Sequence, residues 1–241
     1  STEKRWKLGD IYHSRLSVVG PPGAKTSNKA DDVNTEAYYR YQKNYDNLKN
    51  GNRCGIACPS RKEVVYVGAN DGMLHAFDSN TGSELWAFIP PTMLQSLRKM
   101  DSVKANSSHS VYGVDGSPVV KDIYYGGKWR TILLTGMGRG GHGYFAMDVT
   151  NPNSPSFLFA FQNDTINKQI YHWDASGNRV DLGYVAGIPA ERDYSKLGEA
   201  WSTPVIMAMP NGTTRKWVAV FGAGYNGGVS TDYGSAVYVI D

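Results

Sequence analysis

Short apolar runs separated by turn residues recur along the chain from residue 63 onward. The first run, Val64-Val65-Tyr66-Val67, is rich in β-branched and aromatic residues, and Asn70-Asp71-Gly72 follows it. Residues of the first kind favour strands, and those of the second tolerate the positive φ of a hairpin turn. Further strands are expected over 73–77 and 84–89, with a turn at 78–82 between them. The pattern predicts an antiparallel unit of short strands.

The same unit returns twice. In each later copy, Ser117-Pro118 or Thr203-Pro204 opens a strand, a strand led by tryptophan follows, a glycine loop turns the chain, and a return strand ends in aspartate. The closing aspartates of the three copies are Asp78, Asp148 and Asp241. A repeat of strand-rich units is typical of β-propeller blades, because one sheet cannot cover both of its own faces. A β-sandwich is the alternative.

We therefore expect a mainly β fold: a partial β-propeller of about three blades with inserted loops and short helices. The residues from Val65 to Asp78, followed by Thr81-Gly82 and Glu84-Leu85-Trp86, resemble the repeat of a quinoprotein-like (modified) β-propeller. The whole chain, 1–241, would be part of one propeller domain. Residues 1–62 would be a lead-in with a short helix and a cysteine loop, and residues 63–241 would hold the blades. The stretches 92–116 and 151–201 would be insertions of loops and helices.

Two short helices are expected outside the repeats. Tyr38, Tyr41, Tyr45 and Leu48 recur at helical spacing, which predicts a helix over 35–50 with Thr35 as its N-cap. Met93, Leu94, Leu97 and Met100 indicate a second helix, capped by Thr92.

Composition narrows the function classes. The chain has 241 residues, 12% aromatic, and a net charge of only +3, so no electrostatic case exists for nucleic-acid binding. No apolar run reaches about 18 residues, so no transmembrane segment is expected. The sequence begins at Ser1 without a signal peptide, which indicates a processed chain or a fragment.

Candidate chemistry is sparse. Gly136–Gly141 and Gly222–Gly227 both match the dinucleotide-binding spacing G-x-G-x-x-G, but a strand follows each of them where that motif needs a helix. We interpret both as glycine hairpin loops. The five histidines lack metal-ligand spacing, and no nucleophile elbow is present. The isolated aspartates are interpreted as turn or cap residues: Asp71, Asp78, Asp115, Asp122, Asp148 and Asp193.

Cys54 and Cys58 are the two cysteines of the chain, in Cys-Gly-Ile-Ala-Cys-Pro. Two cysteines alone cannot complete a four-ligand zinc site. Two free thiols and one short disulfide both remain open, and the disulfide is favoured if the protein is exported.

Several long motifs follow one another along the chain. They are Trp6-Lys-Leu-Gly-Asp-Ile-Tyr-His13-Ser14, Val65-Tyr-Val-Gly-Ala-Asn-Asp-Gly-Met-Leu-His-Ala-Phe-Asp78, Trp86-Ala-Phe-Ile-Pro90, Asp115-Gly-Ser-Pro118-Val, Gly140-Gly-His-Gly-Tyr-Phe-Ala-Met-Asp148 and Glu199-Ala-Trp201-Ser-Thr-Pro204-Val. From Trp6 to Asp241 the chain resembles the C-terminal propeller of the PilY/PilC proteins, the tip-associated adhesins and assembly factors of type IV pili.

The resemblance implies a non-enzymatic, exported protein at the pilus tip and cell surface. It would support pilus assembly and extension, surface adhesion and twitching motility. Its partners would be minor pilins, the remainder of its own polypeptide, and host or abiotic surface ligands. Calcium is expected for the full-length protein, in a loop beyond Asp241, and no cofactor is expected within this fragment. Export would favour the Cys54–Cys58 disulfide.

The family reading gives the repeat residues a structural role and no catalytic one. These residues are Asp71, Gly72, Asp78, Gly82, Trp86, Gly136, Asp148, Gly222 and Asp241. The alternatives are a propeller dehydrogenase with a quinone cofactor of the PQQ type and an unassigned extracellular binding propeller. A closed propeller takes four or more blades, so apolar strands such as Val64–Val67 and Val218–Phe221 would line exposed blade faces here.

Overall fold

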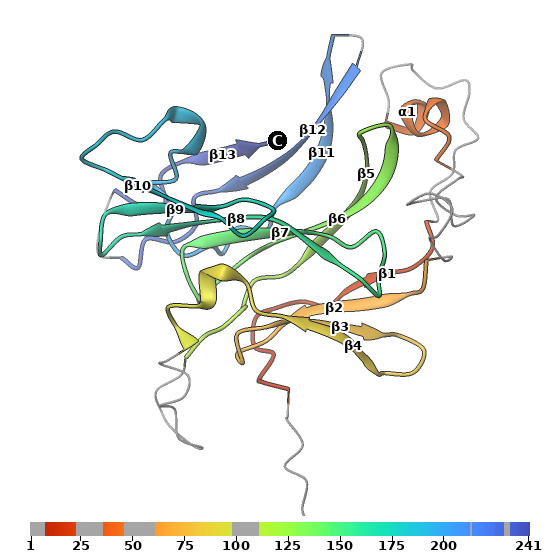
Figure 1. The fold of residues 1–241 in the computed structure, drawn as a ribbon, viewed down its shortest axis with the longest axis horizontal. Helices are drawn as coiled ribbons and strands as arrows, with labels where there is room; N and C mark the ends of the chain where they lie inside the picture. Colours follow the sequence, from red (N-terminus) through yellow and green to blue (C-terminus); the bar gives the residue numbers. More distant parts are fainter. Residues whose placement is uncertain (1–7, 23–35, 46–60, 98–110, 213, 229–231) are drawn as a thin grey trace, which may run out of the picture.

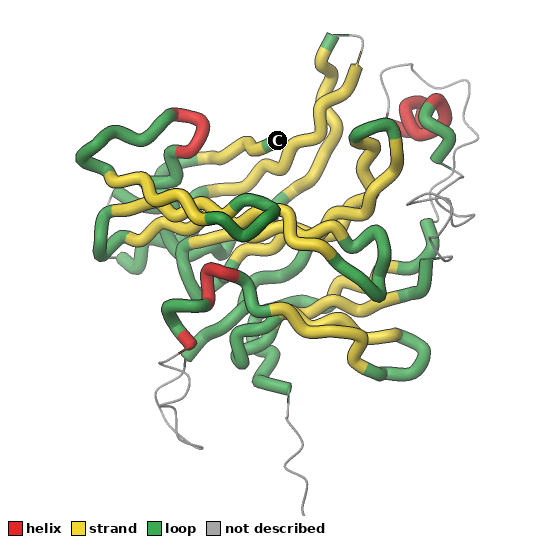
Figure 2. Tube along the Cα trace, viewed as in Figure 1, coloured by secondary structure: helices red, strands yellow, loops and turns green. Residues whose placement is uncertain are grey.

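The computed structural model describes residues 8–22, 36–45, 61–97, 111–212, 214–228 and 232–241. Strands dominate these residues, and the helical pieces are short (Figure 2). The elements are β1 (Ser17–Val19), α1 (Glu36–Gln42), β2 (Val64–Gly68), β3 (Leu74–Asp78), β4 (Glu84–Phe88), η1 (Pro91–Met93), β5 (Val119–Tyr125), β6 (Lys128–Gly136), β7 (Gly143–Asp148), β8 (Ser156–Asp164), β9 (Gln169–Trp173), β10 (Arg179–Gly183), η2 (Ala190–Arg192), β11 (Val205–Asn211), β12 (Thr214–Gly222) and β13 (Val237–Ile240).

The described strands form three antiparallel sheets that follow one another along the chain. Their strand orders are β1-β2-β3-β4, then β10-β9-β8-β7-β6-β5, then β11-β12-β13. Figure 1 shows the three sheets stacked in chain order, with the second between the other two. Strand β5 contacts both β1 and β11, so the first strand of each sheet lies beside its counterpart in the next. The sheets do not close on one another, so the predicted partial propeller of about three blades is confirmed.

The middle sheet is buried on both faces. In β7, Phe145 and Met147 pack into one core with Tyr66 of the first sheet, whereas Tyr144 packs into a second core with Phe221 of the third. Successive strand residues point to opposite faces, so an uninterrupted apolar strand can serve two interfaces. This pattern is that of a blade with a neighbour on each side.

Two sequence expectations are corrected by the strand assignment. The stretch 151–201 is not an insertion of loops and helices, because β8, β9 and β10 extend the middle sheet to six strands. The segment 1–62 is more than a lead-in, because its strand β1 pairs with β2 and so belongs to the first sheet. A run such as Ser-Phe-Leu-Phe-Ala-Phe over 156–161 has the composition of a strand, but the sequence repeat alone does not include it.

The described helical segments differ from the two predicted helices. Helix α1 occupies Glu36–Gln42, and the proposed cap, Thr35, lies outside the described residues. The described part of the second predicted helix begins with a single turn, Pro91–Met93, whose N-cap is Pro90, without a side-chain cap, and Met100 lies outside the described residues. The prediction that Thr92 caps it is wrong. Thr92 lies within that turn, and its hydroxyl donates to the Met137 sulfur at 3.1 Å.

The exposed apolar face lies elsewhere than predicted. Val64–Val67 and Val218–Phe221 contain largely buried residues, with Tyr66 at 1% and Phe221 at 2% exposure. One face of the third sheet is open instead. Strand alternation places five apolar side chains on this face, and all are exposed: Val205 59%, Met207 42%, Met209 43%, Val237 71% and Val239 59%. The opposite face of the same sheet packs on the second core. The third sheet therefore has the apolar surface of a blade that faces a neighbour.

Candidate functional site

Three side chains, one from the segment that leads into each sheet, meet at a single place. His13, Asp115 and Trp201 each lie four residues before the first strand of their sheet, which begins at Ser17, Val119 and Val205. In an antiparallel sheet the first strand begins at the end where the second strand finishes and the third begins. The three lead-in segments and the glycine loops therefore lie at the same end of the sheets.

His13 is the centre of this meeting point. Its Nδ1 lies 2.6 Å from Asp115 Oδ2, and its backbone N–H donates to Asp115 Oδ1 at 3.1 Å. The Asp115 side chain is 1% exposed and that of His13 is 35% exposed. The carboxylate thus fixes the ring through Nδ1, so Nε2 is the ring nitrogen left for other contacts. The expectation that Asp115 is a turn or cap residue is wrong, because it joins two blades.

Aromatic rings surround His13. The centroid of Tyr12 lies 4.2 Å from the His13 ring, that of Trp201 4.8 Å and that of Tyr112 6.3 Å. Trp201 Nε1 donates to Glu199 at 2.7 Å, which fixes the indole. Arg139, from the glycine loop between β6 and β7, donates to the Tyr112 hydroxyl at 3.0 Å and lies 4.4 Å from its ring centroid. We call these five side chains the junction surface: Tyr12, His13, Tyr112, Arg139 and Trp201.

Equivalent positions hold the backbone beneath the junction surface, by a serine hydroxyl in the first and third sheets and by close packing of a glycine in the middle sheet. The N–H of Gly68, at the end of β2, donates to the Ser14 hydroxyl at 3.0 Å, and Gly222, at the end of β12, donates to the Ser202 hydroxyl at 2.9 Å. Gly116 holds the matching position in the middle sheet, where a Cβ would lie 2.0 Å from the Gly136 carbonyl oxygen. A side chain is therefore excluded there.

The glycine loops are hairpin connections, as predicted. Gly138 and Gly224 have φ values of +59° and +84°. A Cβ on Gly140 would lie 1.7 Å from the Gly113 carbonyl oxygen, and one on Gly224 would lie 1.9 Å from that of Glu199. The glycines let the loops approach the neighbouring lead-in segments.

The first repeat carries a buried polar cluster. Gly72 has a φ of +88°, as a hairpin glycine should. Asp71 accepts hydrogen bonds from the N–H groups of Gly9 and Met73, and its Oδ2 lies 3.0 Å from His75 Nε2. The other ring nitrogen of His75 lies 2.6 Å from Glu84. Asp71 is thus a turn residue, as expected, and also half of an ion pair with a buried histidine.

Burial acts to lower the pKa of His75, but the two carboxylates outweigh it and raise that pKa. Burial acts to raise the pKa of Asp71, and its hydrogen bonds to His75 and to backbone N–H groups lower it overall. Both shifts favour the charged pair.

The remaining repeat residues shape turns and packing. Asp78 accepts the N–H of Asn80 and Asp148 accepts that of Thr150, both at 2.9 Å, so the two aspartates close matching turns. Gly82 follows with a φ of +70°. Trp86 Nε1 donates to the Pro152 carbonyl at 2.8 Å.

Two repeat positions differ from this pattern. At Gly136 a Cβ would lie 2.6 Å from the Ala200 carbonyl oxygen, so the glycine permits contact between the second and third sheets. Asp241 forms an exposed ion pair with Lys216 at 2.6 Å. Its contact therefore differs from the turn geometry of Asp78 and Asp148.

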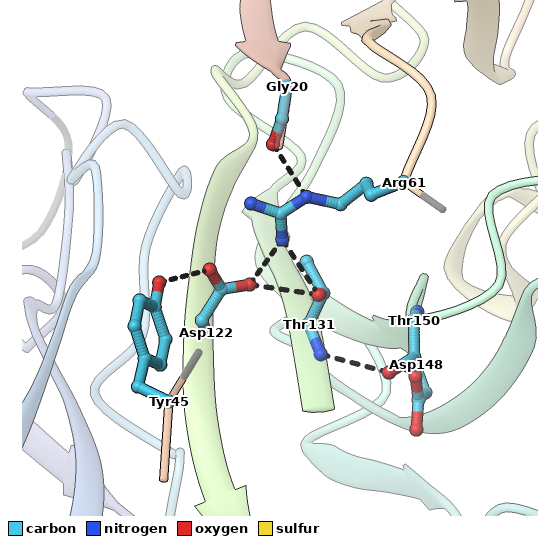
Figure 3. A network of polar contacts seen from close by, with 7 residues as sticks. All are labelled: Gly20, Tyr45, Arg61, Asp122, Thr131, Asp148 and Thr150. Atoms are coloured by element: carbon cyan, nitrogen blue, oxygen red, sulfur yellow. Dashed lines mark hydrogen bonds and ion pairs between the residues drawn. The ribbon is translucent and has the colours of Figure 1, made fainter. Parts of the chain in front are cut away.

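A buried ionic network, absent from the sequence predictions, attaches α1 and its flanking residues to the middle sheet (Figure 3). Arg61 donates from Nη1 to Asp122 at 2.5 Å and from Nε to the Gly20 carbonyl at 2.5 Å. Asp122 also accepts from the Tyr45 hydroxyl at 2.7 Å and from the Thr131 hydroxyl at 2.9 Å. Asp122, in β5, is therefore no turn or cap residue.

The network is largely shielded from water, since the side chains of Arg61 and Asp122 are 6% and 13% exposed. Burial raises the pKa of Tyr45 and the Asp122 carboxylate raises it further, so the phenol remains a donor. The partners lie 61 and 77 residues apart in the chain, so no local motif marks them. The one sequence signal for this network is the position of Arg61, between the cysteine segment and the first residue of β2.

Cys54 and Cys58 lie outside the described residues, so their disulfide stays a prediction. Within the described ranges, no group of three or more His, Cys, Asp or Glu side chains could hold a metal ion. Among the same residues, no helix is long and apolar enough to cross a membrane.

Comparisons with known proteins agree with this architecture. The type IV pilus biogenesis factor PilY1 of Pseudomonas aeruginosa (strain UCBPP-PA14) is 32% identical over 90% of this chain, and the PilY1 homolog of Xylella fastidiosa is 34% identical over 91%. The chain spans only 15% and 14% of the lengths of these relatives.

A solved structure is similar as well. The crystal structure of the P. aeruginosa PilY1 C-terminal domain matches with a TM-score of 0.57 and 30% identity, over 93% of this chain and 34% of that one. The family model of the PilY1 β-propeller domain matches residues 9–241, which include all three sheets and the junction surface. The chain belongs to the PilY1 β-propeller family.

Proposed function

We propose that this chain is the propeller part of a non-enzymatic type IV pilus protein that supports pilus assembly and extension, surface adhesion and twitching motility. The observation that carries the proposal is the match of residues 9–241 to the PilY1 β-propeller domain, together with relatives named as type IV pilus biogenesis factors. The protein would be exported through the periplasm and act at the pilus tip and cell surface.

Its proposed partners are the minor pilins at the pilus tip, the remainder of its own polypeptide, and ligands on host or abiotic surfaces. The open face of the third sheet supports the second of these, because exposed valines and methionines are a normal blade-to-blade surface. Calcium is proposed for the longer protein, in a loop beyond Asp241, because the resemblance to the pilus-tip family implies it.

The site supports a binding role over catalysis. His13 and Asp115 form an ordered dyad, but their neighbours are aromatic rings and a stacked arginine, which is the composition of binding surfaces. A quinone-dependent dehydrogenase is the competing function. It predicts reduction of a redox dye by the purified protein when a PQQ-type quinone and calcium are added.

A deletion and complementation experiment tests the proposal. Removing the coding segment for residues 9–241 from the chromosome should abolish sheared surface pili and twitching zones, and the intact gene should restore both. A gene carrying Asp181→Ala, at an exposed ion pair on β10, is the matched complementation control and should also restore both. Normal piliation, adhesion and twitching in the deletion strain would refute the proposed function.

A further inference from the structure

The junction surface presents aromatic rings to solvent at a place where three blades meet. Tyr12 is 65% exposed and Trp201 is 38% exposed, although each ring also contacts His13 edge-on. Exposed rings are costly to leave in water and are common in ligand sites, where they supply flat apolar area at a low entropy cost. The rings are held by side-chain contacts, so the surface is already formed before a ligand arrives.

Hydrogen-bond donors and acceptors accompany the rings. Asp115 holds His13 through Nδ1, so Nε2 is the ring nitrogen that can hydrogen-bond to a ligand, and among the described residues no hydrogen bond engages that atom. Arg139 supplies N–H donors beside Tyr112, and the tyrosine hydroxyls both donate and accept. A ligand that matches this surface needs an apolar face together with several hydroxyl groups.

The charged groups of the junction surface and its surroundings are already paired with its side chains. A cation would meet Arg139, which already lies 4.4 Å from the Tyr112 ring centroid and takes the place of a cation–π partner. The carboxylates are likewise engaged: Asp115, whose side chain is 1% exposed, bonds His13, and Glu199 accepts from Trp201. A neutral ligand therefore fits this surface without displacing an existing pair.

We propose that the junction surface binds a neutral saccharide, whose pyranose C–H groups pack against the exposed rings of Trp201 and Tyr12 and one of whose hydroxyls hydrogen-bonds to His13 Nε2. Ring C–H groups carry partial positive charge and pack against the negative face of an aromatic ring. Asp115 is a positioning residue here, because it orients His13 and has no exposed oxygen surface of its own to offer. This site is independent of the proposed role in pilus assembly.

Saturation-transfer difference NMR on the full-length protein tests the inference. The probes are the neutral methyl glycosides of glucose, galactose, mannose and N-acetylglucosamine, with sialic acid and glucosamine as charged comparisons. We expect transfer to at least one neutral glycoside, strongest at ring C–H protons on one face, and weaker transfer to the charged sugars.

Three variants locate the binding. Trp201→Ala and Tyr12→Ala should each weaken the neutral glycoside about tenfold, because each removes one stacked ring. Tyr125→Ala is the matched control: Tyr125 is 67% exposed, close to Tyr12 at 65%, and lies at the opposite end of β5. It should leave binding unchanged. Circular dichroism of each variant checks folding, and Tyr12 is exposed enough that its substitution should not unfold the protein.

The possible outcomes separate this inference from the proposed function. Loss of glycoside binding with normal piliation in the Tyr12→Ala strain supports a saccharide site distinct from assembly. No transfer to any neutral glycoside, or equal transfer in the Tyr12, Trp201 and Tyr125 variants, overturns the inference whatever the pili do. Binding of a pilin through the same residues, without glycoside binding, would also overturn it and make the surface a protein interface.

Discussion

Removing the Asp122 carboxylate is the most direct test of how the α1 segment is attached. The Asp122→Ala substitution takes three hydrogen-bond acceptor contacts from Arg61, Tyr45 and Thr131 and leaves the guanidinium 94% buried beside no carboxylate. Breaking a buried ion pair by deleting one partner costs about 3–5 kcal/mol. We expect the lower end, about 3 kcal/mol, because the Gly20 carbonyl and the Thr131 hydroxyl still accept from Arg61.

Urea unfolding of the intact protein, followed by tryptophan fluorescence, measures this cost. Trp129 reports on the region, because its ring centroid lies 4.5 Å from that of Tyr45. Asp181→Ala is the control, since its pair with Arg179 is 40% and 44% exposed and should be worth about 1 kcal/mol or less.

A double substitution separates the ion pair from its burial. Arg61→Met combined with Asp122→Leu removes both charges, so it should cost less than the sum of the two single changes. The reasoning would be refuted if Asp122→Ala destabilised the protein no more than Asp181→Ala does.

Four further predictions follow from local features. Gly72→Val should lower stability by about 1 kcal/mol or more, because φ is +88° there, whereas Gly183→Ala, where a Cβ meets nothing, should not; unchanged melting of the Gly72 variant would contradict the hairpin. His75, whose pKa Asp71 and Glu84 raise, should contribute stability that is full below its unfolded pKa of about 6.5 and is lost as pH rises through the higher folded value; a melting-temperature difference between wild type and His75→Gln that grows with pH would be the wrong sign. Mass spectrometry of unreduced tryptic peptides should show the two cysteines linked, and two freely alkylated thiols in surface protein would exclude the disulfide. The chain expressed alone should aggregate or bind a hydrophobic dye strongly, and lysines in place of the exposed valines of β11 and β13 should reduce the signal; a cooperatively melting monomer with low dye binding would argue against an open blade face.

The strands were predictable because their signal is local. Val64–Val67 and the Asn-Asp-Gly turn after it specify a hairpin from composition alone, and β2 and β3 pair as expected. The glycine loops were also predictable, because a strand and not a helix follows each of them. The strands β8 to β10 were missed, because the repeat that identified the other strands does not extend over them.

The meeting of His13, Asp115 and Trp201 could not be read from any one motif. Their shared spacing, four residues before an opening strand, was present in the sequence and becomes informative only once the three strands are known to be neighbours. Packing between blades decides that, and it depends on contacts between residues about 100 positions apart, such as His13 with Asp115. For the same reason, the sequence alone could not predict which of the aspartates would be buried.

The matching lead-in positions have a consequence for how such a surface can diversify. Hydrogen bonds and glycines at the neighbouring positions hold the backbone of each lead-in, whereas the side chains at the three equivalent points are an imidazole, a carboxylate and an indole. The backbone frame therefore does not require the same residue type at all three points. Replacing the exposed indole changes what the surface can recognise and leaves the hydrogen bonds of its frame in place. Selection can thus alter ligand preference at the exposed indole with little penalty in folding, whereas the buried Asp115 carboxylate, which joins two blades, is held by its contacts with His13.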